Sequence, residues 1–419
     1  MLLSWRQWRV LAVIAVVFLG TAVGQMGSVA VAYPIPAPPQ PVETAQPLGR
    51  LPVGVRVDEW PIEGRSLRVT TWYPAALVAA PPYVTPDGIK GVAVLDAPPE
   101  RTSGPYPLIV FSPGLGAPGD AYYFYTQNLA SQGYVVVGID HLDASEAEPG
   151  LGLADAARGI LELGKQNPSD TVFLTFSNWF KSTQFGMTYR PQEIELALDR
   201  TLERNTQPDD PLYGTINPDK IAMSGHSLGA AYTLLKGGMA IDCNHTYAPL
   251  PDDWSQVRVN DIDPCAMPAF QALADSKQLR DPRIKAILPL ASPVFISDSQ
   301  IAASASEIDV PLMFLTGADP YFEASRAPQW SVYEAAQTPK YFVEIRNTDH
   351  FLVTDVAVLN PYVGNLSLPW NSADFVEKAE VYMRYSTAFF DYYIKGDVHA
   401  KSVLDAPSGG FVVGVNHVS

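Results

Sequence analysis

The sequence has few cysteines and few basic residues, and both shortages exclude classes of protein. Two cysteines in 419 residues rule out a disulfide-framework miniprotein and a cysteine-rich zinc site. Lys and Arg total 28 against 44 Asp and Glu, so the formal net charge is −16. Nucleic-acid binding and docking onto anionic lipid both need a basic surface. We therefore expect neither kind of partner.

Charged residues are also scarce, at 17%, whereas apolar residues make up 47%. This balance is typical of a globular chain and too apolar for a disordered one. Proline, in contrast, is abundant, with 38 residues. Such an excess indicates long, stiff connections between elements.

The N-terminus has the layout of a targeting segment. Two arginines precede an apolar run over residues 10–24, and small residues follow at Ala30 and Ala32. This pattern predicts a secretory signal peptide over residues 1–32, cleaved after Ala32. A membrane anchor retained through residues 10–32 is the alternative, because that stretch is long enough to span a bilayer. Either way, we expect the folded part to be secreted or held in the cell envelope.

Export is consistent with the cysteine positions. Cys243 and Cys265 lie 22 positions apart, and an oxidising compartment favours a disulfide between them. Two unpaired thiols are the alternative. Residues 33–51 are rich in proline and predict an extended tether between the leader and the domain.

Short apolar runs alternate with helical patterns along the rest of the chain, which predicts an α/β class with a mostly parallel, doubly wound sheet. Strands are expected over residues 67–73, 107–111, 134–139, 220–224, 284–290, 311–316 and 340–345. Helices are expected over residues 122–132, 191–202, 227–237 and 373–395. We assign residues 52–398 to one catalytic domain with an insertion at about 151–189, and residues 399–419 to a C-terminal tail.

The chemistry concentrates at Ser227. Residues 225–229 read Gly-His-Ser-Leu-Gly, directly between a predicted strand and a predicted helix. In that context the G-x-S-x-G pattern predicts a nucleophile elbow, because a serine on so sharp a turn needs neighbours without bulky side chains.

A serine hydroxyl needs a base and an acid partner to act as a nucleophile. In the chain order serine, acid, histidine, the base is His350, which follows the last predicted strand. A structural loop histidine is the alternative reading of this residue. Asp319 follows the strand at 311–316 and is the expected acid, with Asp298 as its rival. A solvated turn aspartate is the alternative for both.

Two backbone N–H groups should bind the negatively charged oxygen that develops during acyl transfer. The residue after the nucleophile, Leu228, supplies the first. The loop after the strand at 107–111 reads Ser-Pro-Gly-Leu-Gly, and its Leu115 supplies the second. No metal or cofactor is implied by this chemistry.

Several motifs together resemble a known family. The runs Phe111-Ser-Pro-Gly-Leu-Gly and Gly133-Tyr-Val-Val-Val-Gly-Ile-Asp-His, followed by the serine motif, resemble α/β-hydrolases of the platelet-activating-factor acetylhydrolase and dienelactone-hydrolase-like group. The resemblance runs from about Val53 to Asp397. One departure is Pro113, where relatives commonly carry histidine, which leaves the substrate preference open. In the acetylhydrolase branch the acid can follow the earlier strand, which keeps Asp298 a candidate.

The resemblance implies a cofactor-free serine carboxylesterase acting on short-to-medium acyl esters, of small molecules or of lipids. A polyester hydrolase or lipase would use the same triad, and an acyltransferase would differ only in excluding water. A dienelactone-type hydrolase would typically need cysteine in place of Ser227. A non-catalytic binding protein on the same scaffold is the remaining alternative, because a fold does not determine a function.

Overall fold

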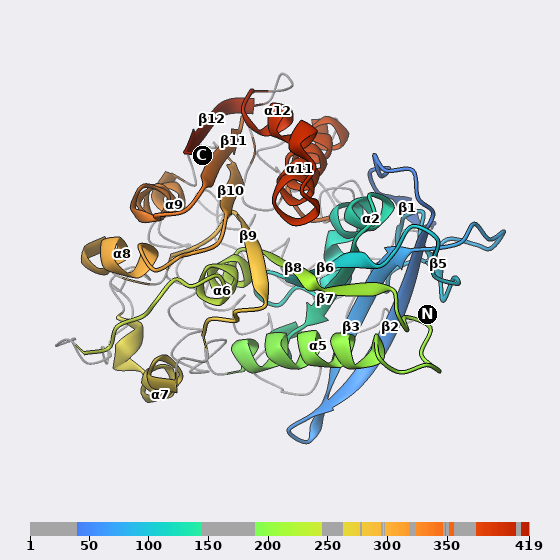
Figure 1. The fold of residues 1–419 in the computed structure, drawn as a ribbon, viewed down its shortest axis with the longest axis horizontal. Coiled ribbons are helices and arrows are strands. Elements are labelled where there is room, and N and C mark those ends of the chain that lie inside the picture. Colours follow the sequence, from blue (N-terminus) through green and yellow to red (C-terminus); the bar gives the residue numbers. More distant parts are fainter. Residues whose placement is uncertain are drawn as a thin grey trace, which may run out of the picture.

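The computed structural model is built on one large sheet covered by helices on both faces (Figure 1). It describes residues 40–144, 189–244, 263–276, 279–294, 296, 298–317, 323–346, 348, 352–355, 374–407 and 412–418. Ten strands form the large sheet: β2 (Val53–Ile62), β3 (Arg65–Pro74), β5 (Val94–Leu95), β6 (Tyr106–Ser112), β7 (Val135–Asp140), β8 (Ile216–His226), β9 (Ile284–Leu290), β10 (Leu312–Gly317), β11 (Lys340–Ile345) and β12 (Val412–Val418).

The order across the sheet is β12-β11-β10-β9-β8-β6-β7-β3-β2-β5. The six central strands, from β11 to β7, are parallel to one another. β12 pairs antiparallel with β11, and β3 pairs antiparallel with both β7 and β2. The expected α/β class with a mostly parallel sheet is therefore confirmed.

The main helices are α2 (Tyr123–Ser131), α5 (Arg190–Arg204), α6 (Leu228–Lys236), α7 (Pro268–Ser276), α8 (Asp298–Ala305), α9 (Glu323–Ala335), α11 (Phe375–Phe390) and α12 (Lys401–Leu404). Helices α5 to α9 pack on one face of the sheet, and α2, α11 and α12 pack on the other (Figure 1).

Each central strand contributes side chains to the cores on both faces of the sheet, because successive side chains point to opposite sides. In β6, Leu108 and Val110 join the core under α5 and α6, whereas Ile109 and Phe111 join the core under α2 and α11. This double burial explains why the strands read as continuous apolar runs.

All seven predicted strands and all four predicted helices are present, with ends that move by a few residues. The largest shift is at β8, which begins at Ile216, four residues before the predicted start. The last predicted helix consists of α11 and a π-helical turn over Asp391–Lys395, and it stops before Gly396 as expected.

The proline-rich stretch differs from the expected tether where it is described. β1 (Val42–Glu43) pairs with β4 (Ile89–Lys90), and the N–H of Leu48 donates to Asn128 Oδ1 at 2.9 Å. Residues 42–51 therefore lie against the domain. Proline removes some donors from such a stretch but leaves its other backbone groups able to pair with distant residues.

The predicted C-terminal tail also contributes to the sheet. Within residues 399–419, α12 forms, and β12 extends the sheet antiparallel to β11, with the His417 ring stacked on Tyr341 at 5.6 Å between centroids. The tail therefore forms part of the sheet, with β12 paired along the whole of β11.

The signal peptide over residues 1–32 and most of the insertion at 151–189 lie outside the described residues. Across the ranges that the structure describes, no helix combines the length and the apolar character needed to cross a bilayer.

Candidate active site

Ser227 lies where the sequence predicts, at the turn between β8 and α6. Its backbone has φ 53° and ψ −123°, in a region that side-chain-bearing residues rarely adopt. Its N–H donates to the carbonyl oxygen of Leu290 in β9 at 3.0 Å, which helps to hold this conformation. Backbone strain of this kind, at the carboxyl end of a central strand, is characteristic of a nucleophile elbow.

The glycines on either side of Ser227 are required by close backbone approach. A Cβ atom added to Gly229 would lie 1.9 Å from the carbonyl oxygen of Ser112 and 2.6 Å from that of Pro113. A Cβ atom added to Gly225 would lie 2.5 Å from the carbonyl oxygen of Gly229. These positions bring the start of α6 into direct contact with the loop that follows β6.

That loop, residues 113–116, runs beside the nucleophile. A Cβ atom added to Gly114 would lie 3.4 Å from Ser227 Cβ. The N–H of Gly114 donates to the hydroxyl of Tyr122 at 2.8 Å, and the N–H of Gly116 donates to Asp143 Oδ2 at 2.6 Å. Both flanking amides of the loop are therefore engaged.

The amide between them is available. Within the described part of the chain, the backbone N–H of Leu115 has no hydrogen-bond partner, and neither has that of Leu228 at the first position of α6. The two candidate oxyanion donors thus lie on segments that touch, while their neighbours Gly114, Gly116 and Ser227 are occupied. This arrangement suits the binding of a developing negative charge.

Four of the six histidines are among the described residues, and the contacts of His141 and His226 are with groups other than the Ser227 hydroxyl. His141 is fully buried, with Nε2 2.8 Å from Ser112 Oγ and Nδ1 2.6 Å from Glu193 Oε2. His226 Nδ1 contacts the hydroxyl of Tyr122 at 2.8 Å. His399 and His417 belong to the C-terminal elements.

The predicted base and acid, His350 and Asp319, lie outside the described residues, as does the side chain of the rival acid Asp298 at the start of α8. Their assignment stays a prediction. The strands that precede them, β11 and β10, end side by side, with Gly317 paired to Ile345.

Shortly after His350, the described residues 352–355 lie against the start of helix α2. The N–H of Asp355 donates to the carbonyl of Ala121 at 2.9 Å, and Asp355 Oδ2 accepts from the N–H of Phe124 at 3.1 Å. Thr44 Oγ1 also donates to this carboxyl. Burial raises the pKa of Asp355 to about 7, against hydrogen bonds that favour its charged form.

A buried polar chain holds the end of β6, and sequence reasoning missed it. Ser112, His141 and Glu193 are 0% exposed and linked in that order, and Arg65 Nη2 donates to Glu193 Oε1 at 2.5 Å. Burial lowers the pKa of His141 well below its usual value, so the ring is neutral. Burial also raises the pKa of Glu193 to about 8, and the guanidinium of Arg65 opposes that rise.

Beside it, a fully buried arginine reaches the same loop. Arg190 Nη1 donates to the carbonyl of Pro113 at 2.7 Å, and Nη2 donates to that of Gly114 at 3.2 Å. Arg190 Nη2 also pairs with Asp143 Oδ2 at 2.5 Å.

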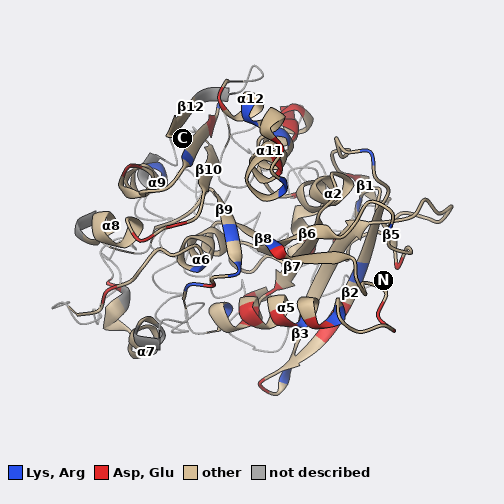
Figure 2. Ribbon diagram, in the orientation of Figure 1, with Lys and Arg blue, Asp and Glu red and all other residues tan. Residues whose placement is uncertain are grey.

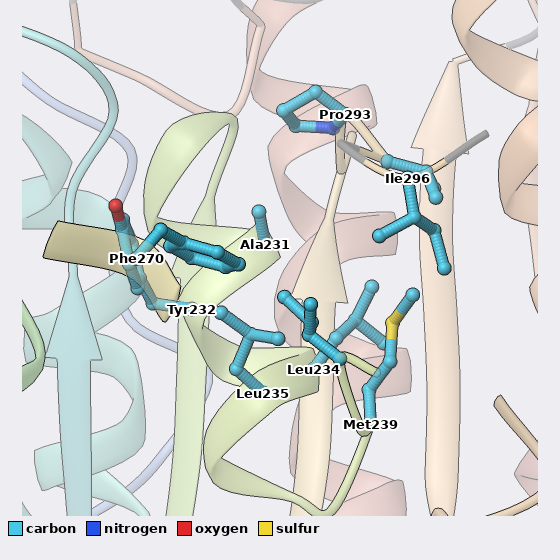
Figure 3. A pocket seen from close by; sticks show the side chains of 10 residues that line it. Ala231, Tyr232, Leu234, Leu235, Met239, Phe270, Pro293 and Ile296 are labelled. Carbon is cyan, nitrogen blue, oxygen red and sulfur yellow. The ribbon is translucent and has the colours of Figure 1, made fainter. Parts of the chain in front are cut away.

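An apolar pocket lies beside the elbow helix, between α6, α7 and the segment after β9 (Figure 3). It contains about 350 Å³ of empty space, its open mouth included. The lining residues are Ala231, Tyr232, Leu234, Leu235, Met239, Ile241, Phe270, Pro293, Val294 and Ile296. Ala231 is one helical turn from the nucleophile, since its N–H donates to the carbonyl of Ser227 at 3.2 Å.

Cys243 and Cys265 form a disulfide, with 2.06 Å between the sulfur atoms. Charged residues of both signs lie along helix α5, whereas few lie on the central strands (Figure 2). No group of three or more His, Cys, Asp or Glu side chains that could hold a metal ion occurs among the residues described.

Comparison with known proteins links part of the chain to one family. Residues 89–158 match the family described as platelet-activating factor acetylhydrolase, isoform II. This match includes the loop at 113–116 but not Ser227. The platelet-activating factor acetylhydrolase of Canis lupus familiaris is 32% identical over 148 residues, which cover 32% of this chain. The matched part spans about a third of that relative, 33% of its length.

A solved structure extends the likeness in fold to most of the chain. The ferulic acid esterase from Streptomyces cinnamoneus superposes with a TM-score of 0.56, covering 90% of this chain and 99% of the esterase. The sequences are 20% identical, so this comparison bears on the fold alone. The chain therefore has the α/β-hydrolase fold and resembles the platelet-activating factor acetylhydrolase group, as its sequence motifs predict.

Proposed function

We propose that this protein is an exported serine carboxylesterase that hydrolyses short-to-medium acyl esters through Ser227, His350 and Asp319. One observation carries the proposal: a serine with φ 53° at a strand-to-helix turn, flanked by two unpaired amides on contacting segments. The partial match to the acetylhydrolase family and the fold of the ferulic acid esterase support it.

In the proposed mechanism, His350 takes the proton of the Ser227 hydroxyl as the oxygen attacks the ester carbonyl. Asp319 orients the imidazole and stabilises its charged form. The amides of Leu115 and Leu228 bind the oxyanion of the tetrahedral intermediate. The alcohol leaves with the proton from His350, and water activated by the same histidine then hydrolyses the acyl-enzyme.

The test compares wild type with Ser227→Ala on p-nitrophenyl butyrate and with a fluorophosphonate probe. We expect wild type to turn over the ester and to be labelled, and Ser227→Ala to do neither while keeping the wild-type circular dichroism spectrum. Ser66→Ala changes an exposed serine and serves as the matched control. Labelling that persists in Ser227→Ala would refute the assignment of the nucleophile, and an unlabelled, inactive wild type would favour a binding protein.

A polyester hydrolase or lipase is the second candidate, and the apolar pocket beside α6 favours it. Esters of increasing acyl length, triglyceride and polyester film separate the two. A rate that falls beyond medium-length acyl chains supports the first function, and turnover of film or triglyceride supports the second.

Export is part of the proposal, and the disulfide supports it because such bonds persist in oxidising compartments. Expression of the full chain followed by N-terminal sequencing tests it. A mature protein that starts at Tyr33 in the medium or periplasm agrees with cleavage after Ala32. Full-length protein in the membrane fraction agrees instead with a retained anchor.

A further inference from the structure

We propose that Arg190 and Asp143 are positioning residues that hold the oxyanion loop so that the amide of Leu115 faces the reacting carbonyl. This inference rests on the proposed esterase function. The side chains of Arg190 and Asp143 form hydrogen bonds with the backbone of the loop, and the proposal gives them no direct part in the chemistry at Ser227.

Together the two side chains engage three of the backbone groups around Leu115. The guanidinium of Arg190 donates to the carbonyls of Pro113 and Gly114, at 2.7 and 3.2 Å. The carboxylate of Asp143 accepts from the N–H of Gly116 at 2.6 Å. The carbonyl of Gly114 and the N–H of Leu115 belong to one trans peptide and point in opposite directions, so this N–H is directed away from Arg190. A guanidinium carries five N–H donors in a fixed plane, so it can hold two carbonyls and a carboxylate at once in a defined geometry.

Both side chains are themselves held rigidly. Arg190 is 0% exposed and Asp143 is 2% exposed. Asp143 Oδ1 accepts from the hydroxyl of Tyr189 at 2.7 Å and from Arg190 Nε at 3.1 Å. The guanidinium also lies 5.9 Å from the ring centroid of Tyr232 in α6, so it bridges the loop and the nucleophile helix.

Stability alone does not explain why the buried ion pair of Arg190 and Asp143 is present. Burying two charges is costly even when they are paired, and apolar residues of similar volume often stabilise a fold as well or better. What apolar residues cannot do is direct the carbonyls and N–H groups of a loop. A donor already in place before the reaction needs no reorganisation in the transition state.

The experiment compares Arg190→Met with Arg204→Met, which changes the last residue of the same helix. Arg204 is nearly buried and pairs with Asp58 Oδ2 at 2.5 Å and with Asp210 Oδ2 at 2.6 Å. It therefore matches Arg190 in helix, charge and pairing, away from the loop. Asp143→Asn is a milder second variant in case Arg190→Met does not fold.

Four quantities are measured: kcat and KM on p-nitrophenyl butyrate, the melting temperature, and Ki for a trifluoromethyl ketone with the same acyl chain. The ketone forms an oxyanion on the serine and reports on the oxyanion hole. For Arg190→Met or Asp143→Asn we expect kcat to fall about 10- to 100-fold with KM within about threefold, since one donor is displaced and not removed. Ki should rise by a similar factor. Arg204→Met should lose stability but keep kcat and Ki.

Folded Arg190→Met and Asp143→Asn variants with wild-type kcat and Ki would overturn the positioning role. So would a fall in kcat without a matching rise in Ki, or an equal fall in Arg204→Met, since each indicates loss of folding alone. A wild type that hydrolyses no ester and binds no ketone would refute the proposed function and this inference with it. An active wild type beside unaltered variants would refute only the inference.

Discussion

Replacing Gly229 by alanine should cost activity through a displacement that can be read from the structure. The added Cβ would lie 1.9 Å from the carbonyl oxygen of Ser112, and real contacts begin near 3.0 Å, so α6 and the end of β6 must separate by about 1 Å. The atoms in the way belong to the backbone and cannot rotate aside. The displacement moves the amide of Leu228 relative to that of Leu115.

A misplacement of about 1 Å at a reacting centre costs on the order of 100-fold in rate. Overpacking of this kind also costs about 1–3 kcal/mol in the free energy of unfolding. The sign is informative, because glycine to alanine inside a helix ordinarily stabilises by about 0.5–1 kcal/mol. Gly229→Ala should therefore be less stable than wild type and about 100-fold lower in kcat.

The assay measures kcat on p-nitrophenyl butyrate and the free energy of unfolding in urea. Gly237→Ala is the control at the other end of α6, where the three atoms nearest to the added Cβ all belong to the side chain of Ile287, with 2.4 Å to Cδ1. That side chain can shift, so kcat should stay near the wild-type value. A folded Gly229→Ala with wild-type kcat would refute the claim that this close approach sets the oxyanion geometry.

Three further predictions follow from described contacts and from the two acid candidates. The double variant Cys243→Ser, Cys265→Ser should lower the free energy of unfolding by about 3 kcal/mol, because the disulfide closes a loop with a sequence separation of 22. An unchanged urea midpoint would contradict this. The pKa of Asp355 is about 7 in the fold against 3.8 unfolded, so its contribution to stability is complete below about pH 4 and is lost as the pH rises through 7, a change of about 4 kcal/mol. Asp355→Asn should remove that pH dependence in urea titrations at pH 4 to 8, and an identical pH profile for variant and wild type would count against it. Asp319→Asn should lower kcat far more than Asp298→Asn, whereas the reverse order would reassign the acid.

Much of the fold could be predicted because its signals are local. A strand buried on both faces must be apolar throughout, so β6, β7 and β10 stand out in the sequence without knowledge of their neighbours. The elbow is equally local: Gly225 and Gly229 are dictated by backbone contacts that only a glycine tolerates.

Other parts could not be predicted because their partners are distant in sequence. Residues 42–51 have a composition typical of a tether, yet they pair with strand β4 and with Asn128, more than 40 residues away. β12 becomes a strand only through β11. Backbone groups of this kind carry no side-chain signature, so composition cannot reveal which of them will be paired.

By itself, the sequence determined the class of the sheet, the serine at its turn and the two amides expected beside it, because periodicity and close backbone approach leave a record in residue type. Only the tertiary structure decided what surrounds them. It placed His141 against Ser112 and Glu193, and it brought Arg190 and Asp143 into contact with the backbone of the loop at 113–116. The physical reason is that a buried charge needs a partner, and that partner is chosen by how the chain packs and not by the residues next to it in sequence.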